Sequence, residues 1–160
     1  MATAVRVMRK VRSINQWSSI TPLNDVPAWY MDALQTVERL TNMAENWDSY
    51  GSARISMLAR TSANELLSIL SLNRTPPPHI APVASGGLQF EWVYEDRELE
   101  LEILPTGDLE FLITSESGEM VEGPVSDSNR QIPILISWVL TGDTLEAESD
   151  LDREYATSPG

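Results

Sequence analysis

The sequence has no cysteine, only one histidine (His79) and no long apolar run. A single chain of this composition cannot form a disulfide, use a thiol nucleophile or build a zinc site from cysteine or paired histidine. A Ser-His-Asp triad would have to use His79, and no Gly-x-Ser-x-Gly motif is present. A spanning helix needs about 20 apolar residues, and no signal-peptide core follows the basic amino terminus. We therefore expect a cytoplasmic protein that makes no membrane contact.

Basic residues are also scarce, with 11 against 24 acidic ones in 160 residues, for a net charge of −13. The imbalance is confined to one half. Residues 1–75 carry eight bases and six acids, whereas residues 76–160 carry three bases and 18 acids. Nonspecific binding to nucleic-acid phosphates requires a basic surface. We therefore expect no direct contact with nucleic acid.

The charge pattern divides the chain into three regions. Residues 1–26 contain four closely spaced bases, and residues 141–160 contain six acids and one base. Terminal segments of such composition are commonly loose, so we predict a flexible basic arm and a disordered acidic tail. Residues 27–140 have the length and apolar content of one domain with its own core.

Three helices are predicted from apolar residues that recur at steps of three and four. The first begins near Pro27 and ends near Glu45–Asn46, and the second begins after an N-cap at Ser56 and ends at Asn73. The third covers about residues 128–140. The prolines at 76–78 predict an extended connector that continues to Pro82.

Between the second and third helices the period changes from helical to alternating. Four strands are predicted, three from the alternating runs within residues 88–114 and a short one at Glu119–Glu122, joined by tight turns. Short turns between successive strands indicate an antiparallel meander. The predicted fold class is thus α+β: two amino-terminal helices, a four-stranded antiparallel β-meander and one carboxy-terminal helix packed on the sheet.

Strand alternation predicts that this sheet has one apolar and one acidic face. The side predicted to lie under the helices consists of Leu88, Phe90, Trp92, Leu99, Leu101, Ile103, Leu109, Phe111 and Ile113. The opposite side then presents Glu91, Glu98, Glu100, Glu102 and Glu110. Arg97 is the main base in this half that could neutralise them.

Three interpretations of the acidic side remain open. It is a solvated surface that maintains solubility and discourages edge-to-edge pairing, a docking face for a basic protein, or a divalent-cation site made of carboxylates. Within the second interpretation, regularly spaced carboxylates would imitate nucleic-acid phosphates.

The turn between the first two helices contains two large aromatic residues, Trp47 and Tyr50, on either side of Asp48. A large aromatic side chain in a polar turn either closes the end of the core or anchors an interface, since Trp and Tyr are favoured at binding hot spots. Both interpretations stay open, and Trp47, Asp48 and Tyr50 join the five glutamates as candidate partner-binding residues.

Two motifs carry a resemblance to other proteins: NWDSYG at residues 46–51 and GGLQFEW at residues 86–92, with the connector 78–82 between them. Together they resemble a recurring set of small bacterial and phage proteins of uncharacterised function, over about residues 28–140. The resemblance implies a prokaryotic or phage setting and carries no established activity to these residues.

No catalytic residue, metal ligand or cofactor is predicted. Asp48 and Glu91 are the best acid–base pair, because each adjoins an aromatic residue that could desolvate it, but nothing in the sequence brings them together. His79 reads as a loop histidine. Gly86-Gly87 lacks the Gly-Lys-Ser/Thr that completes a phosphate-binding loop and reads as a flexible strand entrance.

The sequence therefore predicts a non-enzymatic binding protein that docks on a basic protein surface. The preferred form is an inhibitor of a nucleic-acid-handling defence enzyme. The alternatives are an antitoxin or immunity protein that neutralises a basic toxin, and a carboxylate-dependent enzyme that uses a divalent metal. A homodimer formed through an exposed edge strand also stays open.

Overall fold

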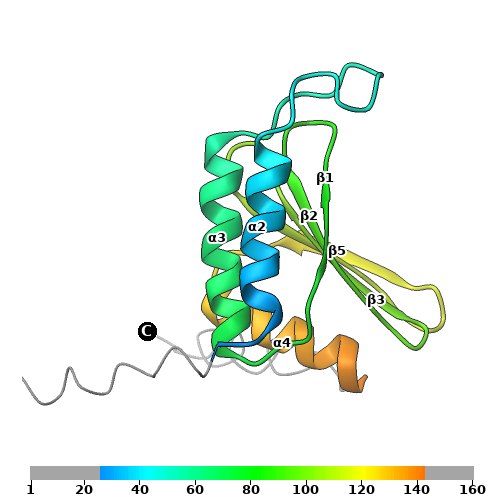
Figure 1. The fold of residues 1–160 in the computed structure, drawn as a ribbon. Helices are drawn as coiled ribbons and strands as arrows, with labels where there is room; N and C mark the ends of the chain where they lie inside the picture. Colours follow the sequence, from blue (N-terminus) through cyan, green and yellow to red (C-terminus); the bar gives the residue numbers. More distant parts are fainter. Residues whose placement is uncertain (1–25, 143–160) are drawn as a thin grey trace, which may run out of the picture.

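The computed structural model describes residues 26–142 of the chain as two layers, with helices on one face of an antiparallel sheet (Figure 1). The elements follow the order α2 (Trp29–Thr41), α3 (Met57–Leu72), β1 (His79–Pro82), β2 (Leu88–Tyr94), β3 (Arg97–Ile103), β4 (Leu109–Thr114), β5 (Met120–Pro124) and α4 (Ser128–Thr141). Strands β1 to β5 are neighbours in sequence order. The predicted α+β class and the meander are confirmed, whereas the predicted arm and tail lie almost wholly outside the described residues.

The helices form where the apolar periods predicted them. Ser56 caps α3 as expected, since its hydroxyl accepts a hydrogen bond from the Ala59 N–H at 2.9 Å. The same hydroxyl donates to the Pro105 carbonyl at 2.6 Å, which ties the start of α3 to the β3–β4 turn. Helix α2 ends at Thr41, earlier than predicted. The apolar residues recur at helical spacing as far as Met43, because the Met43 side chain still packs against the core beyond the end of the helix.

The sheet has five strands, so the prediction of four was wrong. The segment predicted as a connector contains β1, in which Ile80 pairs with Phe90 of β2. The prolines around β1 hid it, because proline cannot donate to a sheet ladder and is tolerated only at edges. Strand β1 is an edge strand, and Ile80 packs against the core. The final strand begins and ends slightly later than predicted, at Met120–Pro124.

Gly87 lies where β2 begins beside the end of β3. A Cβ atom at this position would lie 2.2 Å from the Ile103 carbonyl oxygen, and Gly86 has a positive φ of 99°. The glycine pair therefore permits a close approach of two strands, which a side chain at position 87 would prevent.

The core lies between the helices and the inner side of β2 and β3. Phe90, Leu99 and Leu101 are completely buried there. The helices lie close to β1, β2 and β3, and no described helix backbone approaches β4 or β5. As a result, Leu109 and Phe111, which were predicted to lie under helices, are only half-buried. None of the described helices is both long enough and apolar enough to cross a membrane.

Arg97 lies on the inner side of β3, so its predicted role as the base that neutralises the acidic side is wrong. Its side chain is 9% exposed. Its Nε donates to the Val139 carbonyl at 3.0 Å and its Nη2 to the Leu140 carbonyl at 3.3 Å, both at the end of α4. Its Nη1 lies 2.5 Å from Glu116 Oε1. Arg97 thus joins α4 to the β4–β5 turn.

Candidate functional site

The outer side of the sheet carries all five glutamates that the alternation predicted, and one more. The strand register places Glu91 directly opposite Glu100, and Glu102 directly opposite Glu110. Leu112 of β4 pairs with Glu100 of β3 on one side and with Glu122 of β5 on the other. Because paired residues of antiparallel strands point the same way, Glu122 lies on the same side of the sheet as Glu100. We call this set the acidic face: Glu91, Glu98, Glu100, Glu102, Glu110 and Glu122.

Glu122 was missed by sequence reasoning. It occupies an edge strand of only five residues, which contains a glycine and a proline, so the period-two signal there is weak. The sequence feature that could have identified Glu122 is the short turn at Glu116–Gly118. A turn this short requires the chain to return antiparallel beside β4, which places Glu122 opposite a residue of that strand.

The carboxylates of the acidic face are close enough to affect one another. The pKa of Glu100 lies above its ordinary value, chiefly because the side chain is partly buried and then because Glu91, Glu98 and Glu102 repel its charge. Like charges on neighbouring strands destabilise a sheet. The fold therefore maintains this face at a cost in stability.

Little within the described chain neutralises the acidic face. Of the described ion pairs, only the contact of 3.2 Å from His79 Nδ1 to Glu91 Oε2 reaches it. Glu91 also accepts a hydrogen bond of 2.8 Å from the Gln89 side-chain amide. His79 was read as a loop histidine; it is the first residue of β1 and lies opposite Glu91.

The acidic face is hollowed at its β4–β5 end. The hollow measures about 330 Å³, and its lining includes Leu112 and four glutamates, Glu100, Glu102, Glu110 and Glu122. One apolar side chain, Leu112, among four carboxylates suits the alkyl stem and charged end of a lysine or arginine side chain.

The NWDSYG segment forms a closed loop beyond the end of α2. The Asn46 N–H donates to the Ser52 carbonyl at 2.8 Å, and the Gly51 N–H donates to Asn46 Oδ1 at 2.7 Å. Asp48 Oδ1 accepts from the Tyr50 N–H at 2.8 Å. The neighbouring Ser52 side chain, followed by the backbone N–H of Tyr50, holds the pKa of Asp48 below its ordinary value. Asp48 therefore organises this loop.

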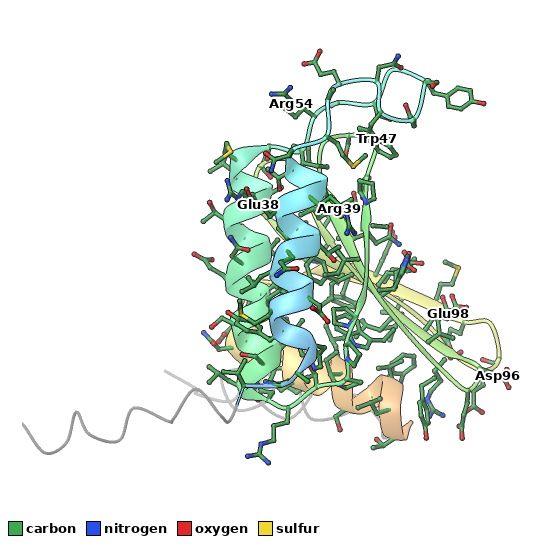
Figure 2. The ribbon with its side chains drawn as sticks, viewed as in Figure 1. Glu38, Arg39, Trp47, Arg54, Asp96 and Glu98 are labelled. Carbon is green, nitrogen blue, oxygen red and sulfur yellow. The ribbon has the colours of Figure 1, made fainter. Side chains whose placement is uncertain are left out.

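The two aromatic residues of the loop have different surroundings. The Tyr50 side chain projects into solvent, 92% exposed. Trp47 is half-buried, its Nε1 donates to the Ala53 carbonyl at 3.3 Å, and it is not among the half-buried side chains that pack against the core. Figure 2 shows Trp47 and Glu98 at opposite ends of the sheet. The structure thus brings the glutamates together but keeps this loop apart from Glu98.

The two carboxylates considered for acid–base chemistry have separate partners. Asp48 binds the backbone of its own loop, whereas Glu91 contacts Gln89 and His79. Within residues 26–142, no group of three or more His, Asp or Glu side chains is arranged to hold a metal ion.

No protein-family model matches the chain, and the searches for similar curated proteins and similar solved structures gave no match. The resemblance to small bacterial and phage proteins stays a prediction.

Proposed function

We propose that this protein is a non-enzymatic binding protein whose acidic face docks on a basic surface of another protein. The observation that carries the proposal is the pairing of carboxylates in register, Glu91 with Glu100 and Glu102 with Glu110. Lysine and arginine side chains of a partner would relieve repulsion that the described fold leaves in place.

The expected energetics follow from exposure and charge. Six carboxylates on one exposed sheet face create a local negative potential, which would accelerate association with a basic surface and disfavour acidic partners. The hollow around Leu112 would accept one basic side chain of the partner. A second copy of this protein would present like charge to the acidic face, so the proposed partner is a different protein.

Within this proposal, the preferred partner is an enzyme that handles nucleic acid in a defence system. Such an enzyme needs a basic groove for phosphates, and rows of carboxylates at strand spacing would occupy that groove in place of nucleic acid. The alternative is a basic toxin that this protein neutralises as an antitoxin or immunity protein. Both versions use the same face and the same stoichiometric mode of action.

The exposed Tyr50 supplies a second contact in this proposal. A tyrosine held on a hydrogen-bonded loop loses little conformational freedom when it is buried at an interface, and tyrosine is enriched at hot spots. Because the loop projects beyond one end of the sheet (Figure 1), the partner would have to extend past that end of the acidic face.

The proposal is tested by affinity capture with two variants of equal charge. The face variant Glu100→Lys/Glu102→Lys is compared with the control variant Asp32→Lys/Glu45→Lys, whose altered positions are exposed on the first helix and the following loop. We expect a host or phage protein to be retained by the wild type and the control but lost with the face variant. Retention should also weaken with added salt, because exposed charges are screened. Equal retention by both variants would contradict the proposal.

A further inference from the structure

A groove of about 1090 Å³ lies beside α3, at the end of the sheet where β4 begins and β5 ends. One wall is the outward side of α3, and the other walls are the β3–β4 turn and the connection from β5 to α4. We call it the side groove. It meets the sheet only at Leu109 and Glu110 of β4 and at Pro124 of β5.

The lining of the side groove combines polar side chains with an apolar part. Ile69, Leu109 and Val125 contribute half-buried surfaces that continue the core, and Leu72 is 80% exposed at one end. A volume of about 1090 Å³ gives room for part of one helix, whose diameter is roughly 10 Å.

The charge of the side groove selects among the segments that could fill it. Its lining carries the four acids Glu65, Asp108, Glu110 and Asp127, and no lysine or arginine lines it among the described residues. Two segments of the chain lie outside residues 26–142. Residues 143–160 carry six acids and one base, whereas residues 1–25 carry four bases and one acid. Charge complementarity favours the amino-terminal segment.

The sequence of that segment fits the groove in pattern as well as in charge. Val7, Val11 and Ile14 recur at steps of four and three, which defines one apolar stripe at helical spacing. Its four bases (Arg6, Arg9, Lys10 and Arg12) fall between these positions. Such a segment can present its apolar residues to the groove floor and its bases to the acidic rim.

The connection is also long enough. Trp29 at the start of α2 donates from Nε1 to the Thr75 carbonyl at 3.1 Å, so α2 begins beside the end of α3. Leu72, which lines the groove, is the last residue of α3. Residues 18–25 could span about 26 Å when extended, which is several helical turns along α3.

We propose that residues 5–17 of the same chain dock in the side groove as an amphipathic helix. This docking covers the start of β4 and the end of β5 and neutralises the four acids of the groove, of which Glu110 also belongs to the acidic face. The inference does not depend on the proposed function, because it concerns a segment of the same chain and needs no partner protein.

The absence of cysteine makes a direct test simple, since two introduced thiols are the only ones in the full chain. The test pair is Ser13→Cys with Ser68→Cys, where Ser68 lines the side groove. The control pair is Ser13→Cys with Ser85→Cys. Ser85 is exposed and lies near the start of α3, because a Cβ atom added to its neighbour Gly86 would meet the backbone that precedes this helix. Ser68 lies about 18 Å along α3 from that start. Intramolecular disulfide formation under mild oxidation is followed by mass spectrometry.

Docking predicts that the Ser13/Ser68 pair closes at least tenfold faster than the Ser13/Ser85 pair at low protein concentration. Equal rates would show that the arm samples both positions alike and would overturn the proposal. Disulfides formed between two chains would also overturn it, because they would place the arm of a second copy in the groove.

Charge variants give a second readout that does not depend on the position of the thiols. Glu65→Lys in the groove should reduce the rate advantage severalfold, whereas Asn64→Lys, which is exposed on α3 but does not line the groove, should leave it unchanged. Val11→Asp lies outside the described core and should abolish the advantage without unfolding residues 26–142. An advantage that survives both Glu65→Lys and Val11→Asp would contradict docking in this groove.

Discussion

The two sides of the same strands have opposite energetic roles. On the inner side, Phe90, Leu99 and Leu101 are completely buried, and each contributes roughly 1.5–3 kcal/mol of hydrophobic stabilisation. On the outer side, Glu91 faces Glu100, and the pKa of Glu100 is raised, chiefly by partial burial and then by the neighbouring carboxylates. Alternation along β2 and β3 therefore places stabilising and destabilising residues next to each other in sequence.

This contrast indicates that folding stability explains the residues of the inner side but not the carboxylates of the outer side. A solvated face could be polar without carboxylates in register, for example with the threonine or glutamine that occur at Thr114 and Gln89. Concentrated like charge lowers stability in the isolated chain and becomes favourable only beside a cation. The difference between the two sides is what makes the acidic face a candidate docking surface.

The largest expected effect comes from disrupting the inner side. Phe90→Ala removes a ring that is completely buried between sheet and helices, and the lost contacts and the resulting cavity should cost about 3–5 kcal/mol. Urea denaturation followed by tryptophan fluorescence measures the change. A loss below about 1 kcal/mol would show that Phe90 is not in a closely packed core.

The next largest effect concerns the one arginine placed on the inner side. Arg97→Met keeps much of the alkyl packing but removes the hydrogen bonds to the Val139 and Leu140 carbonyls and the ion pair with Glu116. Loss of charged hydrogen bonds should cost about 1.5–3 kcal/mol, measured by the same denaturation. Arg130→Met, at an exposed position in α4, is the matched control and should change stability little. An equal effect of both variants would refute the role assigned to Arg97.

On the outer side, the sign of the effect should reverse. Glu100→Gln removes one of the repelling carboxylates and should stabilise the protein at pH 7 by a few tenths of a kcal/mol, up to about 1 kcal/mol. Glu119→Gln, at an exposed position beside the β4–β5 turn, serves as the control. A destabilised Glu100→Gln variant would show that the carboxylate has a favourable contact instead.

The pH dependence sharpens the same comparison. Because the folded-state pKa of Glu100 is raised, the folded protein holds this proton more tightly than the unfolded chain does. The corresponding stabilisation is complete below the unfolded pKa of about 4.3 and is lost as pH rises through the folded pKa. The advantage of Glu100→Gln over the wild type should therefore shrink as pH falls from 7 towards 4. Melting curves of both proteins across this range measure it, and a constant or growing advantage would contradict the sign.

The smallest expected effect on stability is at Tyr50, whose exposed ring contrasts with the buried ring of Phe90. Because its side chain is 92% exposed, Tyr50→Ala should change the free energy of unfolding by less than about 0.5 kcal/mol. In affinity capture, the same variant should weaken retention of the proposed partner. Unchanged retention would remove the loop from the proposed interface and leave the acidic face as the only contact.

Sequence reasoning succeeded where one residue type repeated at a fixed period. The alternation of leucine and glutamate in β3 predicted both sides of that strand, and Ser56 was identified as the N-cap of α3 from its position before an apolar stripe. It failed at β1, where prolines concealed the pairing of Ile80 with Phe90. It also failed at Arg97, which was predicted to be the main base that could neutralise the glutamates. Position 97 has the same parity as Leu99, so its side chain points inward to the carbonyls at the end of α4.

The sequence by itself determined the fold class and which glutamates share a side, because side-chain direction along a strand depends only on the period of two. Only the tertiary structure decided which glutamates face each other, where Arg97 finds its partners and which strands the helices leave uncovered. Those features depend on the register between strands and on where the helices lie on the sheet, and both are set by contacts between residues far apart in the chain.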